Sequence, residues 1–360
     1  MKKGYIVSWF NCGQNYGQTL QAYALQKTIY NMGYDVAHIC FGLNFDPRLS
    51  IRKSVYEILK MNHFERIVQS KFDRFIKKNM RTTSYFKTYY DIKQFLQYSK
   101  PDFLLCGSDQ IWNPYNVDPI YYLYGLGDEK TKKIAYAVSL CDEKRKEKYY
   151  ETPDIAKWIQ GINKIFTREN SGKTILEDMF NIHSEVVLDP TILLYPEQWI
   201  EYLRLKKMRE KYILCYAFNL NETQKEIIED AAQKNDCAIK YGNILMKDIK
   251  GIKKEPWSPV DFLENIYNAE MVFTDSFHGM VFSILFHKEF LVFDNGNDEE
   301  GDPYYNIDRM VTILQELELS NRIYSNTMTC LGKPIDYSFV NSILDKRRKE
   351  CTDLLRESIG

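Results

Sequence analysis

Short apolar runs that alternate with helical segments constrain the fold of this chain more than any other feature. The run Tyr5–Phe10 is followed by a loop rich in Gly and Asn, and apolar residues then recur at helical spacing over Thr19–Tyr30. A second run, Tyr34–Ile39, comes next. This order predicts a βαβ unit with a polar loop at the carboxyl end of its first strand. Further strands are predicted at Asp102–Cys106, Lys133–Val138, Ile162–Thr167 and Glu185–Leu188.

The same alternation begins again in the second half of the chain. We interpret Asp189-Pro190-Thr191, followed by Pro196, as a linker between the halves. Beyond it, strands are predicted at Tyr212–Tyr216, Ala238–Tyr241, Met271–Thr274 and Phe290–Phe293, and a last helix at Tyr337–Glu357. A length of 360 residues also suits two domains. We therefore predict an α/β fold of two Rossmann-like domains facing a cleft, with domains at residues 1–195 and 196–330 and a C-terminal helix in 331–360 that packs back on the first domain.

Composition excludes several classes of protein. The net charge of -1 provides no overall field for binding nucleic acid. No apolar run reaches the roughly 18 residues that a membrane span requires. None of the eight cysteines forms a C-x-x-C pair, so neither a zinc knuckle nor a redox motif is expected. Free thiols in apolar runs suit a reducing compartment, and we expect a cytoplasmic protein.

The segment Thr274–Ser283 is the strongest candidate for an active-site turn. A predicted strand leads into Asp275-Ser-Phe-His-Gly279, and a predicted helix follows. The carboxyl ends of parallel strands line the crevice of such a fold, and a helix N-terminus offers free N–H groups that suit phosphate or carboxylate. Asp275 or Ser276 is the expected N-cap. His278 is predicted to add a hydrogen-bond donor or a proton; the alternative is that it only satisfies a nearby carbonyl.

Two other predicted strands end in side chains that suit a ligand site. Arg168 follows one of them, where a guanidinium can bind carboxylate or phosphate through two N–H groups, or instead form an ion pair with Glu169. Asp109 follows another and is a candidate for hydrogen-bonding or deprotonating a hydroxyl. Trp112 is a candidate for stacking on a sugar ring; the alternative is an Asx-type turn with a core tryptophan.

Three further patterns limit what the site holds. Asn11–Gly17 lacks the G-x-G-x-x-G spacing, so no nicotinamide cofactor is predicted. Asp294–Asp302 is acidic but lacks the EF-hand order, so we predict no metal there and interpret it as a solvated loop or a lid. Residues 51–80 are predicted to be helical with a basic face, which suits either solvent or a peripheral contact with the inner face of the cytoplasmic membrane.

Taken together, these segments resemble the polysaccharide pyruvyl transferase family. The matching pieces are Asn15–Gln26, Gly107–Pro114, Ala135–Ser139, Thr167–Glu169, Leu188–Thr191 and Thr274–Ser283. They occur in the family's order and span most of the chain. The resemblance implies a fold like that of GT-B glycosyltransferases. It also implies transfer of the enolpyruvyl unit of phosphoenolpyruvate onto two hydroxyls of a sugar, which forms a pyruvate ketal in a capsule or other surface polysaccharide, or in its lipid-linked precursor.

The resemblance also assigns roles to residues. The first domain is expected to hold the acceptor and to contribute Arg168, and the second to hold the donor. His278 is implied as the acid that protonates the donor or as a phosphate ligand, and Asp109 as the group that orients or deprotonates the acceptor hydroxyl. The donor site is expected to comprise Arg168, Ser276, His278 and Gly279, and the acceptor site Asn15, Tyr16, Gly17, Gln18, Asp109, Gln110 and Trp112. Phosphoenolpyruvate enters as a co-substrate, with no cofactor.

One departure from the family's pattern concerns the donor. Members often carry Arg two residues before the histidine, where this chain has Ser276. Either another cation replaces that guanidinium or the donor differs. Two other functions are therefore kept as alternatives: a GT-B-type glycosyltransferase with a nucleotide-sugar donor, and a non-catalytic glycan-binding component of a polysaccharide assembly complex.

Overall fold

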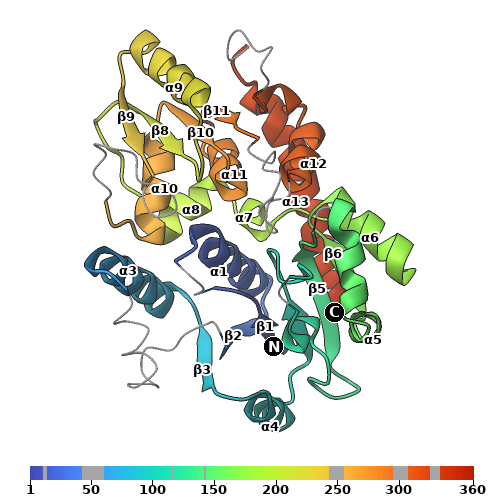
Figure 1. Cartoon of the computed structure of the whole chain (residues 1–360). Coiled ribbons are helices and arrows are strands. Elements are labelled where there is room, and N and C mark those ends of the chain that lie inside the picture. Colours follow the sequence, from blue (N-terminus) through green and yellow to red (C-terminus); the bar gives the residue numbers. More distant parts are fainter. Residues whose placement is uncertain are drawn as a thin grey trace.

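The computed structural model describes residues 1–10, 14–42, 61–115, 117–141, 143–242, 255–294, 307–324 and 333–360. The predictions made for residues 11–13, 51–60 and 295–302 lie outside these ranges. Figure 1 shows two α/β halves, one above the other, and the chain passes from the first to the second through the short helices α7 (Pro190–Leu193) and α8 (Pro196–Leu203).

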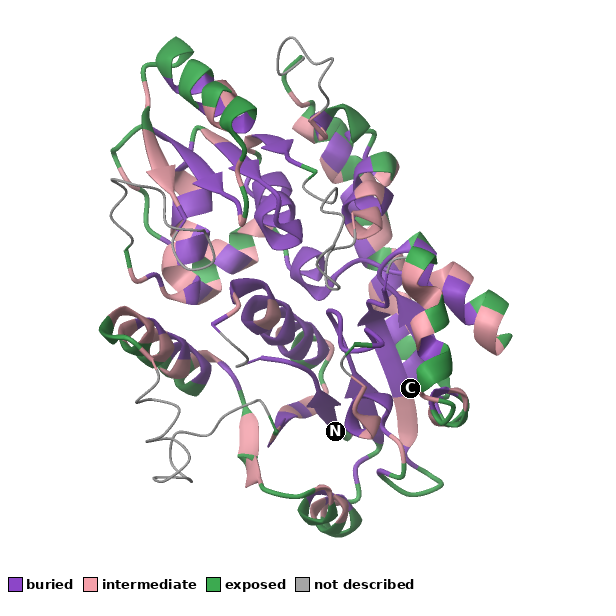
Figure 2. Ribbon diagram, in the orientation of Figure 1, coloured by how far each residue is buried: buried purple, intermediate pink, exposed green. Residues whose placement is uncertain are grey.

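The first sheet is parallel and has seven strands in the order β3-β2-β1-β4-β5-β6-β7. The strands are β1 (Lys3–Val7), β2 (Asp35–Phe41), β3 (Thr82–Phe86), β4 (Phe103–Cys106), β5 (Lys132–Val138), β6 (Lys164–Thr167) and β7 (Glu185–Val186). The central strands derive from the apolar runs and are buried (Figure 2). Strands β2 and β3 are added on one side of β1, and the later strands are added on its other side, beginning with β4. Ligands of such sheets bind outside the carboxyl ends of the strands, at the point where this order switches.

The second sheet is also parallel, in the order β11-β10-β8-β9. It consists of β8 (Tyr212–Tyr216), β9 (Ala238–Tyr241), β10 (Met271–Thr274) and β11 (Glu289–Val292). Its switch point lies between β8 and β10, so the turn that follows β10 occupies the same kind of position as the turn that follows β4. Two parallel sheets with intervening helices confirm the predicted α/β class.

Helices cover both sheets. In the first half they are α1 (Tyr16–Asn31), α3 (His63–Asn79), α4 (Tyr89–Ser99), α5 (Ile155–Gln160), α6 (Asn170–Phe180), α7 (Pro190–Leu193) and α8 (Pro196–Leu203). In the second half they are α9 (Glu222–Lys234), α10 (Pro259–Asn268), α11 (Phe277–Leu285), α12 (Asp308–Glu316) and α13 (Tyr337–Ile359). Asn and Ser side chains cap several of them, as at Asn15, Asn62 and Ser258. None of the helices in the described ranges is both long enough and apolar enough to cross a membrane.

An aromatic cluster joins the two halves. The ring of Tyr16 stacks on that of Phe262, with centroids 4.8 Å apart, and its hydroxyl donates to the carbonyl of Trp257. Trp199 packs edge-on against Phe282 and tilted against Tyr23 of α1. These residues belong to one continuous core, so α1 is held against α10 and α11 by buried apolar area.

The last helix runs back along the first sheet, as the red ribbon beside β5 and β6 shows in Figure 1. Arg348 Nε donates to the carbonyl of Ile192, and Arg347 donates to that of Val186. At the far end, Lys2 Nζ donates to the carbonyl oxygens of Ile359 and Gly360. The C-terminal helix therefore closes over the strands of the first half.

The structure adds a short helix and a strand to the predicted elements. The segment interpreted as a linker, Asp189-Pro190-Thr191, begins the short helix α7 and is buried. Asp189 caps this helix by accepting from the backbone N–H of Thr191, and Pro190 occupies the first helical position, where its missing N–H costs nothing. Strand β3 was not predicted because its residues are only partly buried and form no apolar run.

Candidate functional site

The turn after β10 is built by short polar side chains. Thr274 Oγ1 donates to the carbonyl of Tyr216 at 2.6 Å and accepts from the backbone N–H of Ser276 at 3.0 Å. Ser276 Oγ then accepts from the backbone N–H of Gly279 at 3.3 Å and is the N-cap of α11. Of the two N-cap candidates, Ser276 therefore takes that role, and His278 becomes the second residue of the helix.

Asp275 ties this turn to its neighbour across the switch point. Its carboxylate accepts from the backbone N–H groups of Phe218 and Asn219, which follow β8, at distances of 2.8 to 3.1 Å. The side chain is buried. Asp275 therefore fixes the relative position of two loops and so orients the turn that carries His278.

Gly17 brings the first helix of the chain directly against His278. A Cβ added to Gly17 would lie 2.0 Å from His278 Nδ1, closer than any side chain tolerates. Gly279 is similarly confined, since its added Cβ would lie 2.4 Å from Thr274 Oγ1. The absence of a side chain at Gly17 allows α1 to approach the imidazole ring, and its absence at Gly279 allows α11 to pack closely against the end of β10.

Arg168 lies at the centre of a buried carboxylate cluster. Its Nη1 donates to Asp189 Oδ2 at 3.0 Å and its Nη2 to Asp109 Oδ1 at 3.3 Å, while Nε lies 3.7 Å from Glu169 Oε2. Only 1% of the Arg168 side chain is exposed. Its guanidinium carbon also lies 4.5 Å from the ring centroid of Phe277. Asp109 and Arg168, the two candidate residues of the first sheet, thus contact each other, and Arg168 also contacts Phe277 in the turn of the second sheet.

Asp189 connects this cluster to the histidine. Its Oδ1 accepts from the backbone N–H and the hydroxyl of Thr191, and its Oδ2 accepts from Ser108 Oγ at 3.2 Å as well as from Arg168. Its Oδ1 also lies 3.9 Å from His278 Nε2. Burial alone would raise the pKa of the Asp189 carboxyl. The charge that His278 carries when protonated, the charge of Arg168 and the Thr191 hydrogen bonds together hold this pKa below its usual value. Asp189 is therefore ionised.

The other ionisable groups respond to burial in opposite senses. Burial raises the pKa of Glu169, an effect partly opposed by Arg168 and by the backbone N–H of Leu140. Burial lowers the pKa of His278, and the negative charges of Asp189 and Asp109 oppose this only in part. The imidazole is thus neutral near pH 7 in the free protein. Its Nε2 has no hydrogen-bond partner within the described residues.

The residues predicted at the acceptor side fall into three groups. Asn15 and Gln18, in the first turn of α1, are partly exposed, and Gly17 contacts His278. Asp109 and Gln110 are buried beside β4 and β5. Tyr16 and Trp112 lie in the cores instead.

Trp112 and Tyr16 do not present rings to a ligand in this structure. Trp112 is fully buried, stacks on Tyr122 at 5.0 Å and donates from Nε1 to the carbonyl of Tyr121. Of the two interpretations of Trp112, the core tryptophan is the one observed. Tyr16 is occupied by its contacts with Phe262 and Trp257. Both rings are enclosed because apolar faces of this size are stabilised by burial.

Sequence reasoning missed three contributors: Asp189, Phe277 and Arg309. An Asp before a Pro that begins a helix is a recognisable N-cap signal, yet nothing local indicates that its second oxygen binds Arg168. Phe277 was passed over although it lies between the N-cap and the histidine. Arg309, in α12, lies with its guanidinium carbon 5.9 Å from the Phe277 ring centroid.

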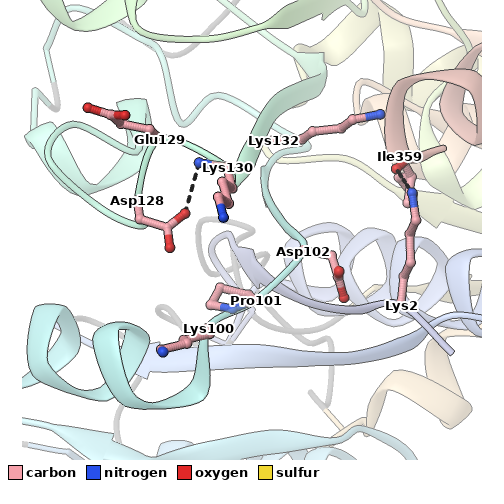
Figure 3. A pocket seen from close by; sticks show the side chains of 9 residues that line it. All are labelled: Lys2, Lys100, Pro101, Asp102, Asp128, Glu129, Lys130, Lys132 and Ile359. Atoms are coloured by element: carbon pink, nitrogen blue, oxygen red, sulfur yellow. Dashed lines mark hydrogen bonds between the residues drawn. The ribbon is translucent and has the colours of Figure 1, made fainter.

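A second group of charges surrounds a cavity at the opposite edge of the first sheet. This cavity has a volume of about 580 Å³ and is lined by Lys2, Lys100, Pro101, Asp102, Asp128, Glu129, Lys130, Lys132 and Ile359 (Figure 3). It lies at the amino ends of β1, β4 and β5. Most of these charged side chains are exposed, and Asp128 accepts from the backbone N–H of Lys130 within its own turn. Among the residues that the structure describes, this edge contains no counterpart of the buried Arg168 cluster.

Comparison with known proteins supports the family and the fold separately. The sequence profile of the family described as "Polysaccharide pyruvyl transferase" matches residues 15–297. No curated protein sequence matches the chain. Among solved structures, the S. aureus MnaA-UDP complex is similar at 13% identity and a TM-score of 0.50, over 96% of this chain and 88% of that chain. UDP-GlcNAc 2-epimerase from Methanocaldococcus jannaschii is similar at 13% identity and a TM-score of 0.50, over 99% of both chains. These likenesses show a shared fold and confirm the GT-B-like architecture.

Proposed function

Because the chain belongs to the polysaccharide pyruvyl transferase family, we propose that it transfers the enolpyruvyl group of phosphoenolpyruvate to two hydroxyls of a sugar. One observation carries the proposal. His278 is buried, its Nε2 has no hydrogen-bond partner in the described part of the chain, and it lies beside the ionised Asp189 at the carboxyl ends of both sheets. A group so placed can exchange a proton with a bound substrate.

The proposed reaction needs one proton delivered to carbon. Protonation of C3 makes C2 electrophilic, and two acceptor oxygens form bonds to C2 while its bond to the phosphate oxygen breaks. Each acceptor hydroxyl releases a proton, so one of these protons replaces the proton given to C3 and the other leaves with phosphate. His278 is proposed to protonate C3, and Asp109 to orient or deprotonate an acceptor hydroxyl.

A bound anion would prepare His278 for this role. The imidazole is neutral in the free protein because burial lowers its pKa. A phosphate or carboxylate placed next to it favours the charged form and raises that pKa. Donor binding and protonation of the acid are therefore coupled, so the acid becomes charged only when there is a substrate to protonate.

Arg168 is proposed to hold the carboxylates in position. Its guanidinium contacts Asp189, Asp109 and Glu169, so removal of its charge would leave buried carboxylates without compensation. Its contribution to donor binding is then chiefly indirect, through the placement of Asp189 beside His278.

Phosphate release tests the proposed function. The protein is incubated with phosphoenolpyruvate and a set of sugar and lipid-linked acceptors, with an acceptor-free sample to measure hydrolysis. We expect acceptor-dependent phosphate release and an acceptor that gains a pyruvate ketal. Binding and turnover of a nucleotide-sugar, with no phosphate release from phosphoenolpyruvate with any acceptor, would instead support a glycosyltransferase.

A further inference from the structure

The buried cluster has more negative than positive charge. Asp109, Glu169 and Asp189 surround Arg168, and the nearby His278 is neutral in the free protein. Even with Glu169 protonated, two carboxylates face one guanidinium. In a desolvated site such an excess repels an anion, since the interaction between charges strengthens as the dielectric constant falls. A phosphorylated donor therefore needs positive charge beyond that of Arg168.

Arg309 lies where that charge is needed. The guanidinium carbons of Arg168 and Arg309 lie 4.5 and 5.9 Å from the centroid of the same ring, that of Phe277, which immediately precedes His278. Arg309 differs from Arg168 in being partly exposed rather than buried. Two guanidinium groups thus approach one aromatic side chain, a buried one inside the carboxylate cluster and a partly exposed one from α12.

The helix that carries Arg309 is fixed to the site. Asp308 Oδ2 accepts from the backbone N–H of Ser171 at 2.8 Å, and Thr312 Oγ1 accepts from that of Asn170 at 3.3 Å. These N–H groups belong to the first turn of α6, directly after Arg168 and Glu169. The residues on either side of Arg309 therefore dock α12 onto the same segment that supplies the buried cluster.

The charge of Arg309 acts on groups in that cluster. Burial has the largest effect on the pKa of His278, followed by the charges of Asp189, Asp109 and Arg168. The charge of Arg309 makes a further, smaller contribution that lowers this pKa. It also opposes the burial that raises the pKa of Glu169. The guanidinium that lies 5.9 Å from the centroid of the Phe277 ring therefore also acts electrostatically on both of these residues.

We propose that Arg309 binds the phosphate group of the donor and is the specificity-determining cation of this site. A guanidinium presents two parallel N–H groups to two phosphate oxygens, and Arg309 is partly exposed, so a ligand can reach it. The phosphate then lies between Arg309 and His278, and its charge raises the pKa of the imidazole. This assignment rests on the proposed pyruvyl transfer for the identity of the donor.

The test compares Arg309→Gln with Arg309→Lys and with Lys173→Gln, which removes a partly exposed charge from the neighbouring α6. For each, the KM for phosphoenolpyruvate and the inhibition by inorganic phosphate are measured, with circular dichroism to verify folding. Arg309→Gln should raise both the KM and the phosphate inhibition constant by about 10- to 100-fold, the size of a lost charged hydrogen bond. Arg309→Lys should recover part of the loss, and Lys173→Gln should stay within about twofold of the wild type.

The outcomes separate the two proposals. Turnover of phosphoenolpyruvate with an unchanged KM and unchanged phosphate inhibition in Arg309→Gln overturns the role of Arg309 and leaves pyruvyl transfer standing. If the wild type does not turn over phosphoenolpyruvate, the proposed function fails, and thermal stabilisation by inorganic phosphate still decides about Arg309. Stabilisation that is lost in Arg309→Gln supports the anion site, whereas equal stabilisation of both proteins, or of neither, overturns it.

Discussion

The two edges of the first sheet carry similar residues in different states. At the carboxyl edge, Asp109, Arg168 and Asp189 are buried and contact one another. At the amino edge, Asp102, Asp128 and Lys130 surround a cavity but are exposed, and Asp102 and Asp128 accept from backbone N–H groups of their own surroundings. The open hollow and the desolvated charges therefore lie at opposite ends of the same strands.

This difference shows what distinguishes a reactive edge from a solvated one. Exposed ions are screened by water, so their pairing contributes little to stability. Buried ions need partners, and the removal of one partner leaves another without compensation. The following predictions use this contrast, starting with the largest effect.

Replacement of Asp189 should have the largest effect. Asp189→Ala removes the partner of Arg168, Ser108 and Thr191, and should lower the free energy of unfolding by about 3–5 kcal/mol. Urea denaturation measures this loss, and transfer activity should disappear with it. Asp128→Ala at the amino edge is the matched control and should leave the urea midpoint almost unchanged. Equal effects of the two substitutions would remove the distinction between the edges.

His278→Ala should separate activity from stability. We expect kcat to fall by at least about 100-fold, the usual contribution of a positioned acid, with thermal unfolding close to that of the wild type. The fold should persist because no described hydrogen bond of Nε2 is lost. Near-normal phosphate release in this variant would exclude His278 from the mechanism.

Gly17→Ala tests the contact between the two halves at the site. The new Cβ would lie 2.0 Å from His278 Nδ1, so the imidazole must move. A displacement of this kind should reduce kcat by about 10- to 100-fold. Gly161→Ala, where the new Cβ would lie 3.3 Å from a carbonyl oxygen on the surface of the first domain, serves as the control. If both variants keep full activity, the position of His278 does not depend on α1.

Donor affinity should depend on pH through His278. The pKa of the free imidazole is lowered by burial, and a bound anion raises it, so binding takes up a proton between these two pKa values. The affinity for phosphoenolpyruvate should therefore fall as pH rises through that interval, by at most about tenfold per pH unit. Calorimetry in buffers of different ionisation enthalpy measures the proton uptake. The uptake should vanish in His278→Ala, and its persistence there would assign it to another group.

The smallest effect is expected at the amino edge. Lys130→Ala alters an exposed side chain beside the cavity, far from the carboxyl ends of the strands. Transfer activity should stay within about twofold of the wild type. A larger loss would mean that the hollow at the amino edge takes part in the reaction.

Local patterns predicted the fold well, because each strand and helix carries its own signal. The apolar runs at Tyr212–Tyr216 and Met271–Thr274 became β8 and β10 with these bounds. Strand β3 was missed because its short, partly exposed sequence begins with three polar residues and resembles a loop. The start of α7 at Asp189 was not predicted because Asp-Pro-Thr is common in both turns and helix starts.

The chemistry of the site was only partly predictable. His278, Arg168 and Asp109 could be selected because each follows a predicted strand at the same edge. Their connections could not, since Asp189 binds Arg168 from 21 residues away and Ser108 from 81 residues away. The enclosure of Tyr16 likewise depends on Phe262 in the other half of the chain. Such contacts arise only when the two sheets meet.

The product formed in heavy water tests the central claim most directly. In D₂O, delivery of a solvent-derived proton to C3 should give an acceptor-linked ketal whose methyl group carries one deuterium, with one phosphate released for each ketal. NMR of the purified product measures both, and His278→Ala should form neither. A product that keeps the C=CH₂ double bond of the enolpyruvyl group would contradict this account of the site. The account would also be contradicted if the wild-type protein released no phosphate with any acceptor.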